Sequence, residues 1–204
     1  MKAMILAAGR GERMRPLTDT CPKPMLKAGG VPLIVRHIGK IRDEAGIKDI
    51  VVNTAWLPEV LHEGLGDGSR IGVRISWSDA IPGGLETAGG IRKALPLLGT
   101  EPFLVVNGDS LMTCSYSTLT RALPEGIRAR VFLADNPPHH PEGDFSIGRD
   151  GHLSGERQLT FTGAAVYSPE LFSDVPEGKI KLAPYLRKWA REGQVLAEKI
   201  SGLW

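Results

Sequence analysis

The sequence predicts an α/β fold with a mixed, mainly parallel β-sheet sandwiched between helices. In the first half of the chain, apolar stretches of strand length alternate with amphipathic helical stretches, which is typical of strands joined by helical crossovers. Residues 3–8 and 103–107 are apolar almost throughout, as expected of strands buried on both faces. The second half has strand-like stretches with little helix between them, which indicates antiparallel additions to the sheet.

Local signals in the first half place each element in turn. The strand at 3–8 leads into Gly9 and a long polar loop that extends to about Gly30. Pro32 then opens a helix that ends at Gly46, because proline is favoured in the first turn of a helix and glycine beyond its end. The further expected elements are a strand at 49–53, a helix at 58–65, a strand at 73–77, a helix with Ala88, Ile91, Leu95 and Leu98 on one face, and a strand at 103–107.

In the second half, apolar and alternating stretches again predict strands. The expected elements are strands at 128–134, 144–148 and 160–167, a helix at about 181–191 and a final edge strand at 195–200. No internal repeat, linker or low-complexity segment interrupts the chain. We therefore expect residues 1–204 to form a single domain.

Composition and charge narrow the possible functions. Hydrophobic residues make up 42% and charged residues 24% of the 204 residues, which are ordinary values for a globular protein. The net charge of +2 leaves no broad basic surface, so neither nucleic acid nor an anionic membrane is an expected partner. The chain has two cysteines, which lack metal-binding or redox spacing, and it shows no signal peptide or long apolar segment. These features predict a cytoplasmic protein. Monomer and homodimer both remain open.

A glycine-rich loop follows the first strand directly, at residues 6–18 (LAAGRGERMRPLT). Backbone N–H groups after such a strand are well placed to bind phosphate oxygens, and glycine allows the close approach. The dinucleotide-binding fingerprint fails because Met14 occupies its third glycine position, and the Gly-Lys-Ser/Thr of a Walker loop is absent. The alternative is an ordinary turn that carries the solvated arginines Arg10, Arg13 and Arg15.

Residues 22–24 (PKP) lie in the same connection, and their prolines stiffen the backbone around one lysine. Together with the loop and three later segments, they resemble the signature of the sugar-1-phosphate nucleotidyltransferases. Residues 85–90 (LETAGG) resemble that family's second nucleotide loop, and residues 107–109 (NGD) resemble its metal-binding turn. Residues 161–163 (FTG) resemble a sugar-contacting strand. The resemblance covers nearly the whole chain and implies a Rossmann-like sheet of the nucleotide-diphospho-sugar transferase type.

The resemblance also implies a role for each matching residue. Arg15, Lys23 and Asp109 are the expected catalytic residues: Arg15 neutralises the departing pyrophosphate, Lys23 bridges the two reacting phosphates, and Asp109 binds Mg²⁺. A turn or cap residue is the alternative interpretation of Asp109. The expected nucleotide-binding residues are Ala8, Gly9, Gly11, Glu12, Arg13, Lys23, Gly83, Leu85, Glu86 and Thr87. The expected sugar-phosphate-binding residues are Asn107, Asp144, Glu156, Thr162, Gly163 and Lys181.

Residues 135–145 and 53–57, with the GERMRPLT form of the loop, point more narrowly to a uridylyltransferase branch of the family. The expected substrates are therefore UTP and a sugar-1-phosphate. A mannose-1-phosphate guanylyltransferase, a hexose-1-phosphate thymidylyltransferase and a non-catalytic nucleotide-sugar-binding relative remain alternatives. The family pattern continues beyond residues 202–204 (GLW) into a second metal-binding aspartate. We accordingly expect either a truncated C-terminal end or a metal site with Asp109 alone.

Overall fold

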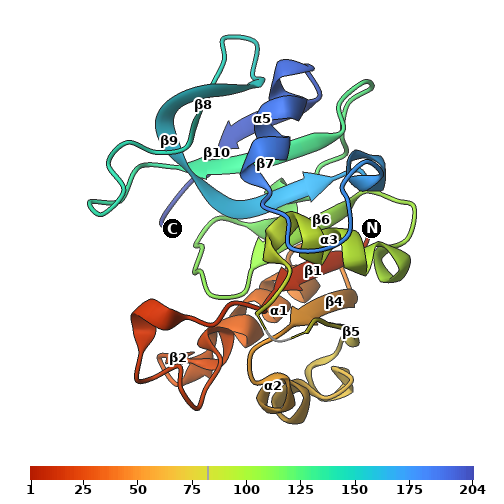
Figure 1. The fold of residues 1–204 in the computed structure, drawn as a ribbon, viewed down its shortest axis with the longest axis vertical. Helices are drawn as coiled ribbons and strands as arrows, with labels where there is room; N and C mark the ends of the chain where they lie inside the picture. The colour runs from red at the N-terminus through yellow and green to blue at the C-terminus, as the bar shows by residue number, and fades with distance from the viewer. Residues whose placement is uncertain (82) are drawn as a thin grey trace.

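The computed structural model describes residues 1–81 and 83–204 as one layered α/β structure (Figure 1). Its central sheet has eight strands, seven of them in the order β10-β7-β9-β6-β1-β4-β5, with β8 paired to β9. The strands are β1 (Ala3–Leu6), β4 (Asp49–Thr54), β5 (Arg74–Asp79), β6 (Phe103–Asn107), β7 (Ala129–Ala134), β8 (Phe145–Ile147), β9 (Leu153–Tyr167) and β10 (Val195–Lys199). A small antiparallel pair, β2 (Lys27–Ala28) and β3 (Val31–Pro32), lies apart from the sheet.

Strand directions bring many loops to one edge of the sheet. β6, β1, β4 and β5 run parallel, and β10 pairs parallel with β7. β9 is antiparallel to both β6 and β7. The carboxyl ends of β1, β4 and β6 therefore lie side by side, and the long glycine-rich connection begins there. This edge is where ligands bind in open α/β sheets.

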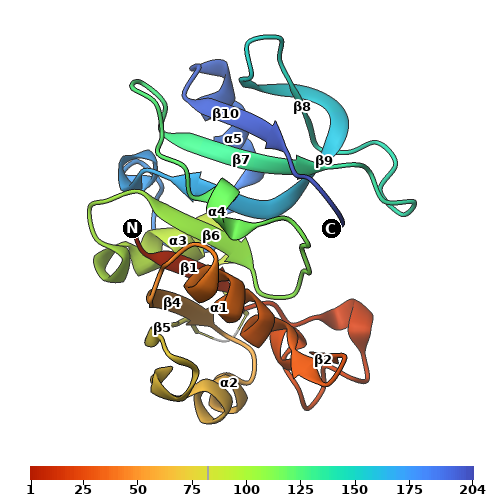
Figure 2. The same ribbon diagram turned by 180° about the vertical axis from the view of Figure 1, so that it is seen from behind.

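Helices cover both faces of the sheet (Figures 1 and 2). The helices are α1 (Leu33–Asp43), α2 (Pro58–Leu65), α3 (Glu86–Leu98), α4 (Tyr116–Leu119) and α5 (Ala183–Arg191), with short 3-10 turns at Glu12–Met14, Lys23–Met25, Ser69–Ile71 and Pro169–Phe172. Side chains of α1, α2 and α4 pack with Ala3 and Ile5 of β1 in one hydrophobic cluster. Met4 points to the opposite face, where it belongs to the cluster that includes α3 and α5. The alternation explains why the central strands are apolar on both faces.

The predicted fold class is confirmed, with some local differences. β9 begins at Leu153 and not near residue 160, because its exposed polar part extends beyond the main sheet and pairs with β8. β10 is an edge strand as expected, yet it pairs parallel with β7, so the second half is not purely antiparallel. α4 was not expected, since four residues are too few to show helical periodicity. Within the part of the chain described here, no helix has the length and apolar character needed to cross a membrane.

The start of α3 is packed unusually close to residues 178–180. The backbone N–H of Ala88 donates to the Ile180 carbonyl at 3.0 Å, and the Ile180 N–H donates to the Leu85 carbonyl at 2.9 Å. A Cβ added at Gly89 would lie 2.0 Å from the carbonyl oxygen of Gly178. Only glycine fits this position, because the obstacle is backbone and cannot swing aside.

Two glycine-to-alanine substitutions should therefore have opposite effects on stability. Gly89→Ala should lower the free energy of unfolding by about 1–3 kcal/mol through overpacking. Gly39→Ala, in the middle of α1 with no atom within 4 Å of the added Cβ, should raise it by about 0.5–1 kcal/mol. Urea unfolding of both variants and the wild type measures these changes. Equal effects of the two substitutions would contradict the close packing at Gly89.

Candidate active site

A cleft of about 860 Å³ opens at the carboxyl ends of β1, β4 and β6. The glycine-rich loop forms one side of the cleft, and the segment that leads into α3 forms another. The residues that line it are Leu6, Ala7, Ala8, Gly9, Arg10, Gly11, Glu12, Arg13, Met14, Lys23, Pro24, Asn53, Ala55, Trp56, Gly83, Gly84, Leu85, Glu86, Thr87, Asn107, Asp109 and Lys179. All the residues expected to bind the nucleotide are thus brought together.

The glycine-rich loop is held in place from both ends. The N–H of Ala7 donates to the buried Asn53 side chain at 2.8 Å, immediately after β1. The Thr18 hydroxyl donates to the Gly11 carbonyl at 2.8 Å, and Gly11 has a φ of 68° that favours glycine. A Cβ at Gly11 would also lie 2.9 Å from the Thr18 side chain. The loop backbone is therefore fixed against the cleft, as a phosphate-binding loop requires.

The arginines of this loop differ in position. The Arg10 guanidinium stacks 3.7 Å from the centre of the Trp56 ring and donates to Asp19 at 2.6 Å, so Arg10 braces the loop. Arg15 also donates to Asp19, at 2.9 Å, but its side chain is 61% exposed and lies outside the cleft lining. The hydrogen bond from Arg10 is the main cause that lowers the pKa of Asp19, and Arg15 adds to it.

Lys23 and Asp109 form an ion pair inside the cleft. The Lys23 Nζ lies 2.7 Å from Asp109 Oδ2, and the two side chains are 28% and 36% exposed. Lys23 is held by the 3-10 turn at Lys23–Met25, which the flanking prolines Pro22 and Pro24 stiffen. Two residues that are 86 positions apart in the sequence are thereby joined inside the cleft.

Asp109 also has the chemistry of a ligand for a hard cation. Its carboxylate faces the cleft, and carboxylate oxygen suits Mg²⁺, which keeps several waters and is often completed by substrate phosphates. Among residues 1–81 and 83–204, no three His, Cys, Asp or Glu side chains gather to hold a metal by themselves. The donor set therefore fits a cation that is shared with bound phosphates and does not fit an all-protein metal cage.

His37, which sequence reasoning missed, anchors the turn that carries Asp109. The buried His37 Nε2 lies 2.8 Å from the Ser110 carbonyl oxygen, and its Nδ1 lies 2.6 Å from the Tyr116 hydroxyl. Burial lowers the pKa of His37 and raises that of Tyr116, so both groups are neutral. Because a carbonyl only accepts, Nε2 donates to Ser110 and the Tyr116 hydroxyl donates to Nδ1. In the sequence, His37 shows only as one polar residue on the apolar face of a helix.

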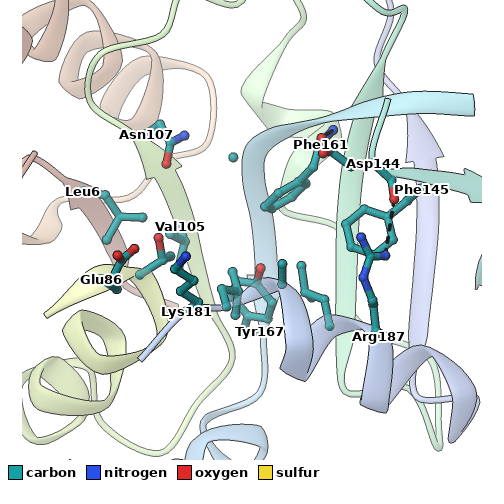
Figure 3. A pocket seen from close by; sticks show the side chains of 15 residues that line it. Leu6, Glu86, Val105, Asn107, Asp144, Phe145, Phe161, Tyr167, Lys181 and Arg187 are labelled. Atoms are coloured by element: carbon teal, nitrogen blue, oxygen red, sulfur yellow. Dashed lines mark hydrogen bonds between the residues drawn. The ribbon is translucent and has the colours of Figure 1, made fainter. Parts of the chain in front are cut away.

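A second, smaller cavity of about 320 Å³ lies next to the cleft and shares Leu6, Glu86, Thr87 and Asn107 with it (Figure 3). Its other lining residues come from β6, β8, β9, α5 and the residues just before β8 and α5: Val105, Asp144, Phe145, Phe161, Gly163, Tyr167, Lys181, Leu182, Ala183, Leu186 and Arg187. Gly163 has a φ of 80°, and a Cβ there would lie 2.1 Å from Asn107 Nδ2. Glycine at this position thus leaves space for the Asn107 side chain, which lines both cavities.

The expected sugar-side residues are only partly assembled around this cavity. Asn107, Asp144, Gly163 and Lys181 line it, whereas Glu156 and Thr162 do not. The Thr162 hydroxyl is buried and donates to the Phe132 carbonyl at 2.7 Å, while Glu156 lies on the exposed part of β9. The lining residues that sequence reasoning missed are Phe145, Phe161, Tyr167 and Arg187. The strands and the helix that carry these residues were expected, but nothing in the sequence shows which side chains of those elements face the cavity.

The site combines a glycine-rich loop after β1, the Lys23–Asp109 ion pair and an adjoining cavity. This arrangement is typical of α/β proteins that bind phosphate-bearing ligands. Comparison with known families is more specific, because the family described as Nucleotidyl transferase matches residues 2–142. The chain belongs to this nucleotidyl transferase family. The family resemblance drawn from the loops, and the assignment as a nucleotidyltransferase, are confirmed.

Two relatives are similar over essentially the whole chain. The N-acetylmuramate alpha-1-phosphate uridylyltransferase of Neisseria meningitidis serogroup B is 52% identical, with 100% of this chain and 91% of the relative covered. The protein of the same name from Caulobacter vibrioides is 32% identical, with coverages of 99% and 89%. The inositol-1-phosphate CTP transferase from T. maritima has the same fold, with a TM-score of 0.81 at 19% identity over 97% of this chain and 84% of that one.

The buried, neutral His37 predicts how stability depends on pH. Below about pH 6.5 the unfolded chain takes up a proton that the folded protein does not, so the free energy of unfolding falls as the pH falls. The loss is at most about 1.4 kcal/mol per pH unit, and it is absent above about pH 7. His37→Gln keeps a donor for Ser110 and an acceptor for Tyr116 but removes this titration. Urea unfolding at about pH 7 and pH 5.5 should show the stability difference from wild type shrinking at the lower pH, and an unchanged difference would contradict a neutral His37.

Proposed function

We propose that this chain transfers the uridylyl group of UTP to N-acetylmuramate α-1-phosphate, which yields UDP-N-acetylmuramate and pyrophosphate. The observation that carries the proposal is the pair of adjoining cavities that meet at Asn107 near the Lys23–Asp109 ion pair. Relatives with this printed name match the whole chain at 52% and 32% identity, which supports the choice of base and sugar. The reaction belongs to peptidoglycan recycling, and we place it in the cytoplasm, where UTP is available. A single domain, residues 1–204, carries it out.

The reaction needs no general base from the protein. A phosphate monoester has a second pKa of about 6, so the attacking oxygen is already mostly deprotonated at neutral pH. That oxygen forms a bond to the α-phosphorus of UTP, and the bond from the α-phosphorus to pyrophosphate breaks. The protein must bring two polyanions together and offset their repulsion, so its contribution is positioning and electrostatics.

Each part of the cleft then has a role. The backbone of the loop from Ala8 to Arg13 binds the triphosphate, and residues 83–87 bind the base and ribose. Lys23 leaves Asp109 to contact both reacting phosphates, and Arg15 swings from Asp19 toward the departing pyrophosphate. Asn107, Asp144, Gly163 and Lys181 hold the sugar phosphate. Asp109 holds Mg²⁺, which neutralises phosphate charge when bound.

Activity measurements with different pairs of nucleotide and sugar 1-phosphate test the proposal directly. Pyrophosphate release would be measured with Mg²⁺ for UTP, GTP and dTTP, each paired with the 1-phosphates of N-acetylmuramate, N-acetylglucosamine, glucose and mannose. Turnover should be highest with UTP and the muramate substrate and should vanish when EDTA removes the metal. Preferred use of GTP with mannose 1-phosphate would replace the proposal by a guanylyltransferase. Binding of UTP without any turnover would instead indicate a non-catalytic relative.

The role of Lys23 predicts a large and specific loss. Lys23→Ala should lower kcat about 10²–10⁴-fold, because it removes the positive charge proposed to contact both reacting phosphates. Lys27→Ala is a matched control, since Lys27 is an exposed lysine outside the cleft lining. Thermal unfolding checks that both variants remain folded. Turnover of Lys23→Ala within a few-fold of Lys27→Ala would remove Lys23 from the mechanism.

A further inference from the structure

The smaller cavity carries two cationic side chains on opposite sides (Figure 3). Lys181 lies near Glu86, on the side that borders the cleft. Arg187, on α5, lies on the far side beside Phe145 and Asp144. A phosphate group on the side that borders the cleft lies toward Lys181 and leaves Arg187, on the far side, without an anionic partner. The cavity therefore has a second place where a negative charge would be stabilised.

Arg187 is positioned by its surroundings, yet its charge is not neutralised by them. Its guanidinium lies 4.8 Å from the centre of the Phe145 ring, and its one side-chain hydrogen bond within the described chain is a 3.5 Å contact to the Asp144 carbonyl. The Asp144 carboxylate is occupied elsewhere, by His140 at 3.1 Å and by the Phe161 N–H at 3.0 Å. Arg187 thus presents several unused donors in a fixed orientation.

Tyr167 provides an independent sign of a ligand in this cavity. Its hydroxyl is fully buried and has no hydrogen-bond partner among the described residues. In Figure 3 this hydroxyl lies between Lys181 and Arg187. A buried polar group left unpaired is costly, and a bound molecule with oxygen atoms would satisfy it. The cavity is therefore built for a polar ligand, and its volume of about 320 Å³ suits one sugar ring.

We infer that Arg187 is a specificity-determining residue that binds the carboxylate of the lactyl ether of N-acetylmuramate 1-phosphate. The inference rests on the proposed function. The phosphate of that substrate must lie toward Lys23, past Asn107, so the rest of the sugar extends into the smaller cavity toward Arg187. N-acetylmuramate differs from N-acetylglucosamine only by the lactyl group. A planar guanidinium suits a carboxylate because it donates two parallel hydrogen bonds, and Phe145 and Phe161 supply the apolar wall for the lactyl methyl group.

Substrate discrimination by an Arg187→Met variant tests this inference. Methionine keeps much of the apolar stem that packs on Phe145 and removes the charge. For N-acetylmuramate 1-phosphate, kcat/KM should fall about 10- to 10²-fold, mainly through KM, as expected for the loss of charge-assisted hydrogen bonds. For N-acetylglucosamine 1-phosphate it should stay within about threefold, and the KM for UTP should not change. Lys188→Met is the matched control, because Lys188 is an exposed neighbour on the same helix and lies outside the cavity lining.

The outcomes separate this inference from the proposed function. If the wild type does not use the muramate substrate, the proposed function fails before Arg187 is considered. If the wild type uses it and Arg187→Met lowers kcat/KM equally for both sugars, Arg187 binds a shared group such as the phosphate, and the inference is wrong. An Arg187→Met protein as selective as Lys188→Met would also overturn it. Thermal unfolding and UTP binding show that each variant is folded, and Arg187→Lys should restore part of the selectivity.

Discussion

The parallel hydrogen bonding of β4, β1 and β6 is the constraint on which the site depends. In this register Leu6 is paired with Asn53 on one side and with Asn107 on the other. Parallel strands end at the same edge, so two polar side chains flank the first residues of the glycine-rich loop. Asn53 fixes the loop through Ala7, while Asn107 begins the turn that carries Asp109. One sheet register thereby aligns the glycine-rich loop, the turn that carries Asp109, and Asn107 in the lining of the smaller cavity.

The charged side chains at this edge of the sheet are paired with one another. Lys23 and Asp109 neutralise each other across the cleft, and Arg10 and Arg15 share Asp19. Arg15 is 61% exposed, and an exposed ion pair contributes little to stability, so Arg15 can leave Asp19 at low cost when an anionic ligand arrives. By contrast, His37 and Tyr116 are buried and neutral, and they hold the backbone beside Asp109 without adding charge. The charged side chains of the cleft thus lie beside a buried, neutral hydrogen-bonded pair.

Local signals in the sequence were enough to predict the strands of the sheet and the main helices. The expected nucleotide-binding residues came from the resemblance of short segments, such as the glycines after an apolar strand and the prolines around Lys23. The structure brings these residues together in one cleft, and their roles as nucleotide ligands stay a prediction. His37 and Arg187 could not be found in this way, because their partners lie 73 and 43 positions away. The start of β9 was missed for a related reason: its polar residues pair with β8 outside the main sheet, so no apolar pattern marks them.

The close approach of Gly163 to Asn107 joins the two cavities at one shared side chain. Residue 163 lies on β9, the antiparallel strand next to β6, and its positive φ leaves the Asn107 side chain room at the boundary. Any side chain at position 163 would displace Asn107 and change both cavities together, since Asn107 lines both. A binding protein for a nucleotide alone would not need this shared boundary. A transferase does, because its two substrates must meet within bonding distance, and an error of about 1 Å costs about 10²-fold in rate.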